Sequence, residues 1–177
     1  KMKKLNFIIK YGLALLLLSF YSCESWLNVT PSDRLSEEML FNDREGFVKA
    51  LNGVYIELNT NELYGRNLTA GALDVMGQYY SVASSSHAFY NYGGLVYTGN
   101  DEKALFDNMW QKCYAVIACC NTIIEKCDER QDVLPGVYYG LYKGEALALR
   151  AMLHLDMLRL FGPVYDETSK TAECIPY

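Results

Sequence analysis

The feature that most constrains the fold is a pair of long helical patterns separated by a short connection. In the first, from about residue 101 to residue 128, apolar residues recur every three or four positions, which is the spacing of one helix face. These residues are Leu105, Met109, Cys113, Val116, Cys120, Ile123 and Cys127. The second runs from about residue 136 to residue 161 and stops at Gly162-Pro163, a helix-terminating pair. We therefore expect an antiparallel helical hairpin.

A third helical pattern precedes the hairpin, from about residue 43 to residue 60. Its apolar face consists of Phe47, Leu51, Val54, Tyr55 and Leu58. Asn42 and Glu45 have the spacing of a capping box, and a short helical turn is expected from Ser36. Either Asn100 or Asp101 is expected to cap the first hairpin helix.

Small residues on the second hairpin helix suggest close packing. Gly140, Gly144, Ala148 and Ala151 would let the two hairpin backbones approach closely, and Gly53 would do the same in the third helix. Helical hairpins of this kind build tetratricopeptide arrays. We therefore predict an all-α fold of tetratricopeptide-like helical hairpins.

Residues 61 to 100 are a long irregular region rich in Tyr, Gly, Ser and Asn. Gly93-Gly94 and Gly99-Asn100 interrupt it, and we expect one short helix near residues 73 to 80. Long irregular loops within compact domains often carry function. This loop region is therefore the first place to look for a binding surface.

The N-terminus has the organisation of a signal peptide. Lysines precede an uncharged run from residue 11 to residue 21, which is shorter than the roughly 20 apolar residues needed to span a bilayer. Cys23 follows Ser22 directly, the position of a lipidated cysteine. We expect a lipoprotein signal peptide at 1–22, a lipidated tether at 23–35 and a helical domain at 36–177; the alternative is an ordinary signal peptide cleaved near Ser22.

Composition excludes several functions. A net charge of −5 argues against nucleic acid as a partner.

Cys113, Cys120 and Cys127 recur every seven residues without a CxxC pair, so we expect them to pack in the core, although one disulfide between neighbouring cysteines remains open. No metal or cofactor site is predicted. No nucleophile elbow, phosphate loop or HExxH motif occurs, so we expect no catalytic residues and no enzymatic activity.

Five ionisable residues interrupt the apolar second hairpin helix, and they are either a reactive site or structural contacts. They are Glu145, Arg150, His154, Asp156 and Arg159. Glu145 and Asp156 are eleven residues apart, too far for an acid–base pair on one helix. We expect Asp156 to pair with Arg159 along the helix, and Arg150 to meet Asn121 of the other hairpin helix.

If these contacts form, the charged residues of the second hairpin helix hold the fold together and do not form a reactive site. Unpaired buried charges are costly, so we predict that Arg150→Ala unfolds the domain. Trp110 lies beside the apolar stripe of the first hairpin helix, and we expect it in the core. We therefore assign structural roles to Trp110, Asn121, Glu145, Arg150 and Arg159.

The stretch "EALALRAMLHLDMLRLFGP" from Glu145 to Pro163 closely resembles the signature helix of the SusD/RagB family. Three other segments agree in order: "CESWLNVTPSDRLSEEMLF", "GFVKALNGVY" and "LFDNMWQKCYAVIACCNTII", the last with Trp110, Tyr114, Ile117 and Asn121. The resemblance implies an outer-membrane lipoprotein of Bacteroidota, surface-exposed and lipid-anchored. It implies binding of an oligosaccharide or polysaccharide, without catalysis, for import by a SusC-type TonB-dependent transporter.

The resemblance directs attention to side chains in the loop region that suit sugar binding, since rings stack on aromatic faces and hydroxyls form hydrogen bonds. The candidates are Asp74, Gln78, Tyr79, Tyr80, His87, Tyr90, Asn91, Tyr92 and Tyr97. We expect Tyr90→Ala with Tyr92→Ala to weaken glycan binding without lowering the melting temperature. Family chains are longer, which implies an N-terminal portion here. The alternative function is a helical scaffold that binds a protein or peptide without sugar affinity.

Overall fold

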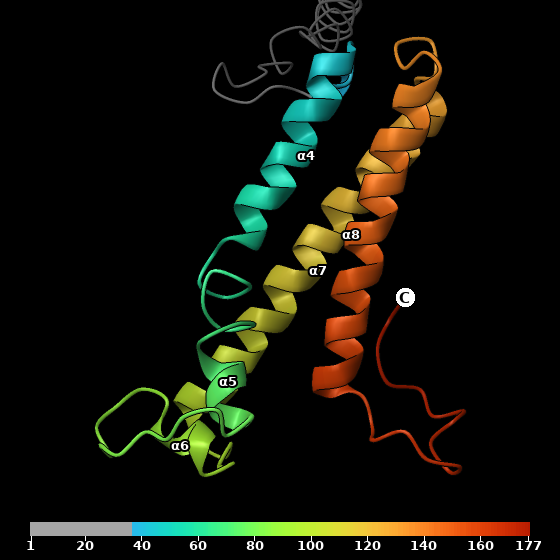
Figure 1. Cartoon of the computed structure of the whole chain (residues 1–177). Helices are drawn as coiled ribbons and strands as arrows, with labels where there is room; N and C mark the ends of the chain where they lie inside the picture. Colours follow the sequence, from blue (N-terminus) through green and yellow to red (C-terminus); the bar gives the residue numbers. More distant parts are fainter. Residues whose placement is uncertain (1–36) are drawn as a thin grey trace, which may run out of the picture. The chain divides into compact units, whose positions relative to one another are not determined.

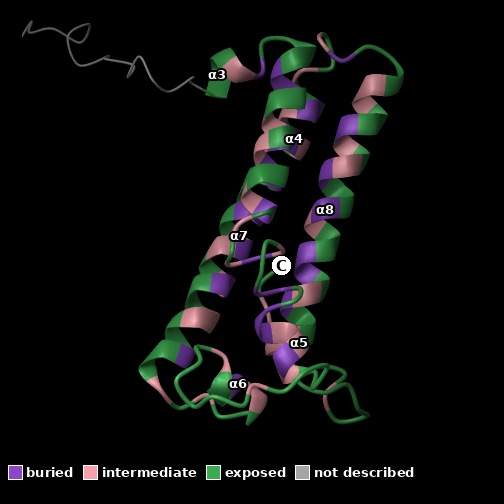
Figure 2. Cartoon of the chain, turned by 60° about the vertical axis from the view of Figure 1, so that its left-hand side comes forward, coloured by how far each residue is buried: buried purple, intermediate pink, exposed green. Residues whose placement is uncertain are grey.

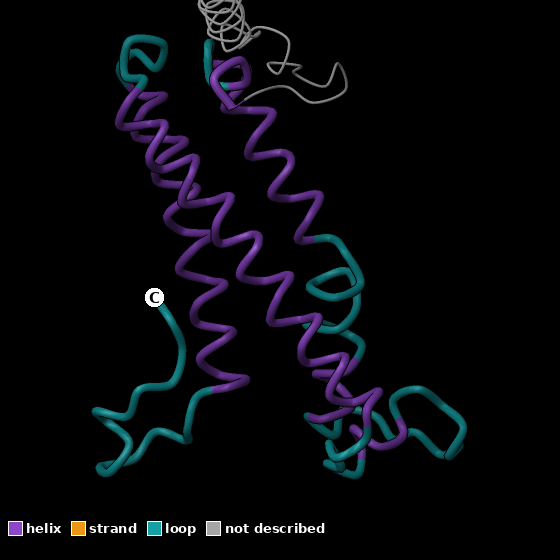
Figure 3. Tube along the Cα trace, turned by 180° about the vertical axis from the view of Figure 1, so that it is seen from behind, coloured by secondary structure: helices purple, strands orange, loops and turns teal. Residues whose placement is uncertain are grey.

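The computed structural model describes residues 37–177, and all of its regular elements there are helices (Figures 1 and 3). The predicted signal peptide, Cys23 and the tether lie outside the described residues. The helices are α3 (Glu37–Leu40), α4 (Arg44–Leu58), α5 (Ala72–Met76), α6 (Tyr90–Gly93), α7 (Asn100–Glu129) and α8 (Val137–Phe161). Residues 37–177 contain no strand, so the predicted all-α class is confirmed.

The predicted hairpin forms from α7 and α8, and α4 packs beside it (Figure 1). The predicted stripe of α7 is buried except for the half-buried Leu105. It meets Phe47, Leu51, Val54 and Leu58 of α4 in one core that continues along α8. The buried stripe of α8 is Tyr142, Ala146, Leu149, Leu153 and Met157. The three long helices therefore share one apolar interior.

The caps differ from the predicted ones. Asp43, not Asn42, begins α4, because its Oδ1 accepts a hydrogen bond from the Gly46 backbone N–H at 2.9 Å. Gly99 precedes α7 and no side chain caps that end, so the prediction of Asn100 or Asp101 is wrong. Position 46 requires glycine, since a Cβ there would lie 1.5 Å from the Leu40 carbonyl oxygen.

The small residues of α8 do not serve the hairpin. A Cβ built on Gly140 or Gly144 would meet no atom within 4 Å, and Ala148 and Ala151 are exposed. The predicted close approach of the two hairpin backbones at these residues is therefore wrong. The same holds for Gly53 of α4, where a Cβ would also meet open space. The core-facing stripe of α8 instead carries larger side chains such as Leu149, Leu153 and Met157.

The five cysteines in the described part of the chain are free thiols. Cys113, Cys120 and Cys127 are buried in the core as predicted, and Cys119 and Cys174 are exposed. Burial raises the pKa of Cys113 to about 12 and that of Cys120 and Cys127 to about 11.

Among the described residues, no helix has both the length and the apolar character needed to cross a membrane.

Candidate functional site

The loop region is held together by a cluster of aromatic rings at the start of α7. Tyr92 of α6 is only 2% exposed and packs against Phe89, Tyr97 and Phe106, with ring centroids 5.9, 6.4 and 5.9 Å away. Tyr97 makes an edge contact with Phe106 at 5.4 Å. Burial raises the pKa of Tyr92 to about 12. This cluster fixes α6 and its flanking loops against α7.

Between α5 and α6 the loop region forms a pocket of about 330 Å³, at the small end of the volumes typical of small-molecule sites. We call it the loop pocket. Its lining is Gln78, Tyr80, Ser81, Val82, Tyr90, Asn91, Gly93, Gly94 and Val96. None of these side chains is charged. Tyr80 and Tyr90 are 44% and 43% exposed, and most residues of this region are exposed to solvent (Figure 2).

Gln78 joins the two walls of the loop pocket. Its Nε2 donates to the carbonyl oxygens of Val75 at 3.2 Å and Gly93 at 2.9 Å. Its backbone has φ 61°, a left-handed conformation uncommon for a non-glycine residue. The Tyr80 hydroxyl donates to the carbonyl oxygen of Ala70. These contacts position the Tyr80 ring and the Gln78 amide before any ligand arrives.

Asn91 links the pocket to α7. Its Nδ2 donates to Glu102 Oε1 at 2.7 Å, and this hydrogen bond lowers the pKa of the Glu102 carboxyl. Glu102 is buried at the first turn of α7, so close to Gly99 that a Cβ there would lie 2.0 Å from its Oε2. The Asn91 amide nitrogen is therefore engaged in holding α6 onto α7.

The predicted candidates separate into four groups. Gln78, Tyr80, Tyr90 and Asn91 line the loop pocket. Tyr79 is 83% exposed and, like Asp74 of α5, is not part of that lining. His87 lines a neighbouring hollow of about 730 Å³ together with Arg66, Asn91 and Glu102.

The fourth group is Tyr92 and Tyr97, and for Tyr92 the structure corrects the prediction. Tyr92 is buried and Tyr97 is half-buried within the aromatic cluster, so Tyr92 offers no open ring face to a sugar. Replacing Tyr92 by Ala would remove a core ring and lower the melting temperature, contrary to the expectation from sequence. Ser81, Val82 and Val96 line the pocket but carried no signal in the sequence, since they are neither aromatic nor strongly polar.

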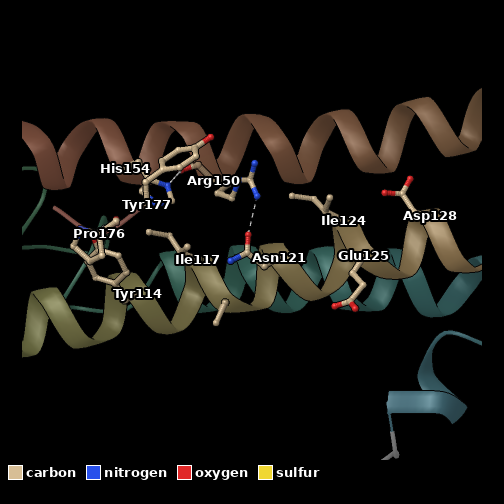
Figure 4. Close-up of a pocket in the computed structure, with 11 residues that line it drawn as sticks. Tyr114, Ile117, Asn121, Ile124, Glu125, Asp128, Arg150, His154, Pro176 and Tyr177 are labelled. Atoms are coloured by element: carbon tan, nitrogen blue, oxygen red, sulfur yellow. Dashed lines mark hydrogen bonds between the residues drawn. The ribbon is translucent and has the colours of Figure 1, made fainter.

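A second hollow, of about 740 Å³, lies along α7 and α8 beside the last residues of the chain (Figure 4). Arg150 Nη1 donates to Asn121 Oδ1 across it at 2.9 Å, the contact expected from the sequence. The Tyr177 ring lies 4.9 Å from His154 and 5.7 Å from the Arg150 guanidinium carbon. Tyr114 donates from its hydroxyl to the Pro176 carbonyl oxygen at 3.0 Å. We call this hollow the interhelical groove.

The remaining charged residues of α8 act between helices or at the surface. Glu145 accepts a hydrogen bond from the Tyr55 hydroxyl at 2.7 Å. Asp156 accepts one from the Tyr64 hydroxyl, and its ion pair with Arg159 spans 3.8 Å. The Arg159 side chain is 74% exposed. The structural role predicted for Arg159 is therefore not supported by buried contacts.

Two other structural expectations need adjustment. Arg150 is half-buried rather than enclosed, so its loss would not leave a buried charge without a partner, and unfolding by Arg150→Ala is no longer expected. Trp110 is half-buried at the edge of the core, between Tyr114 at 4.8 Å and Phe161 at 5.0 Å.

Among the described residues, no group of three His, Cys, Asp or Glu is placed to hold a metal ion.

Two comparisons with known proteins agree on one family. The model of a SusD-like family, described as starch-binding and associating with the outer membrane, matches residues 25–175. The chain is 25% identical over 164 residues to SusD-like protein P2 of Formosa agariphila. That stretch is 93% of this chain but 30% of the relative, so the chain spans less than a third of the relative's length. No solved structure matches the chain.

Proposed function

We propose that this chain, which belongs to the SusD-like family, captures glycans at the outer membrane and binds neutral sugar units in the loop pocket. The observation that carries the proposal is the pocket lining: two half-exposed tyrosine rings beside amide and hydroxyl groups, without a charged side chain. A family described as starch-binding suits a neutral ligand. The ligand class we assign is therefore an uncharged oligosaccharide or polysaccharide.

The chemistry of the pocket fits a sugar ring. Aromatic rings offer a large apolar face to the C–H face of a pyranose, and Tyr80 and Tyr90 bring such faces to one pocket. Sugar hydroxyls both donate and accept hydrogen bonds, as does the hydroxyl of Ser81, and the amide oxygens of Gln78 and Asn91 can accept from them while the Gln78 and Asn91 amide nitrogens hold the pocket walls. Because Gln78 and Tyr80 are already held by backbone contacts, binding would require little ordering of side chains.

The cellular setting is part of the same proposal. Lipid on Cys23 would hold the chain at the membrane surface, where stable anchoring takes more than one acyl chain. A SusC-type transporter would then receive the captured glycan, and the chain itself would act by binding without catalysis. The family's description as associating with the outer membrane supports this setting.

The interhelical groove supports one alternative, a scaffold that binds a peptide without sugar affinity. Ile117, Ala118 and Ile124 give the groove an apolar floor on α7, and Arg150 with Glu125 lies along it. Apolar grooves along helices accept amphipathic peptides. The contacts of Tyr177 with His154 and Arg150 already occupy part of this groove, which favours the loop pocket as the ligand site.

Glycan binding by the purified chain tests the proposal. Maltoheptaose and other neutral oligosaccharides are titrated by calorimetry, with an anionic oligogalacturonate as the matched ligand, and circular dichroism confirms the helical fold. We expect neutral glycans to bind more tightly than the anionic one. A helical chain that binds no neutral glycan, or prefers the anionic one, contradicts the assignment to the loop pocket.

A further inference from the structure

The two amide side chains that line the loop pocket are both held by their nitrogen atoms. Gln78 donates from Nε2 to the carbonyl oxygens of Val75 and Gly93, at 3.2 and 2.9 Å, and an amide nitrogen has only two hydrogens to donate. Asn91 donates from Nδ2 to Glu102 Oε1 at 2.7 Å. The Gln78 amide therefore has only its oxygen left for a ligand, and the Asn91 amide has its oxygen and one N–H.

The orientation of the Asn91 amide is set by the chemistry of its partner. An ionised carboxylate accepts hydrogen bonds and donates none, so only the nitrogen of Asn91 can bond to Glu102. The hydrogen bond from Asn91 lowers the pKa of the Glu102 carboxyl, which keeps this group ionised at neutral pH. Exchanging the oxygen and nitrogen of the Asn91 amide would bring two acceptors together and leave a buried carboxylate without its donor.

Glu102 is itself firmly placed, although it lies outside the loop pocket. It belongs to the first turn of the 30-residue helix α7, and its side chain is buried. The backbone at Gly99 encloses the carboxylate, since a Cβ built there would lie 2.0 Å from Glu102 Oε2. Glu102 is not among the residues that line the loop pocket. Any effect it has on a ligand in that pocket is therefore exerted through Asn91.

We propose that Glu102 is a positioning residue that orients the Asn91 amide, so that the loop pocket selects sugars through hydroxyl groups that donate hydrogen bonds. Because it concerns recognition in the same pocket, this role rests on the proposed function. The amide oxygens of Asn91 and Gln78 accept from the ligand, and the hydroxyls of the pocket tyrosines and of Ser81 are free to rotate. A ligand without donors at these oxygens leaves them unpaired in the complex, which is costly.

Selection by donors differs from selection by charge. An anionic sugar is disfavoured under both, because a carboxylate brings only acceptors to the two amide oxygens. A neutral sugar whose hydroxyls are replaced by fluorine is disfavoured only if the pocket requires donors, since carbon-bound fluorine has no hydrogen to donate. The lining holds no charged side chain that would tell such a neutral derivative from its parent sugar. Fluorinated sugars therefore separate the two kinds of selection.

Calorimetric titration of the full chain with fluorinated ligands tests the selection. Maltoheptaose is compared with three derivatives in which fluorine replaces the hydroxyl at position 2, 3 or 6 of every ring. We expect at least one derivative to bind roughly tenfold or more weakly than maltoheptaose. Equal binding of all four ligands would overturn the selection while the proposed function stands. A chain that binds none of the four contradicts the proposed function, and the selection with it.

The variant Glu102→Gln tests whether Glu102 sets this preference. An amide at position 102 both donates and accepts, so the Asn91 amide is free to turn over, and the affinity ratio of maltoheptaose to the disfavoured derivative should fall severalfold. Adding Asn91→Asp should restore the ratio, because a carboxylate at position 91 accepts from the new amide and again offers only acceptors to the ligand. Asp101→Asn, which removes the exposed neighbouring charge, is the matched control. An unchanged ratio in a folded Glu102→Gln variant overturns the proposal.

Hydrogen exchange of the Asn91 side-chain amide gives a reading that needs no ligand. In the nitrogen-15-labelled parent chain, one of its two hydrogens should exchange with solvent roughly tenfold more slowly than those of Asn108, an exposed residue of α7. The difference should shrink in Glu102→Gln, where the carboxylate acceptor is lost. Equally fast exchange of Asn91 and Asn108 in the parent chain would show that Glu102 does not hold the amide, and would overturn the proposal.

Discussion

Arg150 on α8 donates a hydrogen bond from Nη1 to Oδ1 of Asn121 on α7, over 2.9 Å (Figure 4). The two residues are 29 positions apart, so the bond ties the two arms of the hairpin together. Tyr64 makes a comparable link from the loop after α4 to Asp156 of α8. Arg150 and Asp156 thus attach the apolar helix α8 to its neighbours.

A double-mutant cycle on Arg150 and Asn121 measures this link. Arg150→Ala and Asn121→Ala should each lower the free energy of unfolding by about 1 kcal/mol, the typical net value of one such hydrogen bond. Urea unfolding followed by circular dichroism gives both values. The double variant should lose less than the sum of the singles. Strict additivity would contradict a direct contact, and an unfolded Arg150→Ala would show a larger structural role than the half-buried site indicates.

Tyr64→Phe should destabilise the fold more than Tyr55→Phe. Tyr64 and Asp156 are both half-buried, and removing the hydroxyl leaves a partly desolvated carboxylate without its donor, at a cost of about 1–3 kcal/mol. Tyr55 makes its hydrogen bond to Glu145 at an exposed position, where water replaces the lost donor. Thermal unfolding of both variants gives the comparison, and equal losses would contradict the different roles assigned to the two bonds.

Alkaline pH should destabilise the protein through its core thiols. Burial raises the pKa of Cys120 and Cys127 from 9.0 to about 11 and that of Cys113 from 9.0 to about 12. Since the folded pKa is the higher one, this contribution to stability is complete below about pH 9 and is lost as the pH rises toward 11 to 12. Unfolding free energies should therefore fall across that window. Cys120→Ala should make the fall shallower, and an unchanged slope would contradict the burial of this thiol.

Two glycines of α4 should respond to alanine in opposite directions. At Gly53 a Cβ meets open space, so alanine should stabilise the helix by about 0.5–1 kcal/mol. At Gly46 a Cβ would lie 1.5 Å from the Leu40 carbonyl oxygen, so alanine must displace the connection between α3 and α4 and destabilise the fold. Melting temperatures of the two variants, measured side by side, test the assignment.

The long helices were predictable because each carries a sustained apolar period and ends at identifiable residues. The apolar period of α8 did not determine which face of that helix packs against α7. Gly144 and Ala151 suggested close packing, but the larger Leu149 and Leu153 form the buried stripe. Periodicity places residues on common faces, whereas tertiary contacts decide which face is covered.

In the loop region, the sequence does not show which aromatic residues are buried and which line the pocket. Tyr90 and Tyr92 are two residues apart and identical in type, yet Tyr90 lines the loop pocket and Tyr92 is buried. The difference arises from Phe89, Tyr97 and Phe106, which surround Tyr92. Helix α6 has only four residues, too few to carry a period. The kinds of side chain in the site were therefore predictable, but their separation into pocket and core was not.

The measurement that tests the central claim most directly is the affinity of the Tyr80→Ala, Tyr90→Ala double variant for the neutral glycan that binds the parent chain most tightly. Loss of both ring faces should weaken binding by roughly tenfold or more, while circular dichroism remains helical. Tyr79→Ala, which removes a ring that is 83% exposed and outside the pocket lining, should bind as the parent does. Unchanged affinity in the folded double variant would contradict the loop pocket as the glycan site.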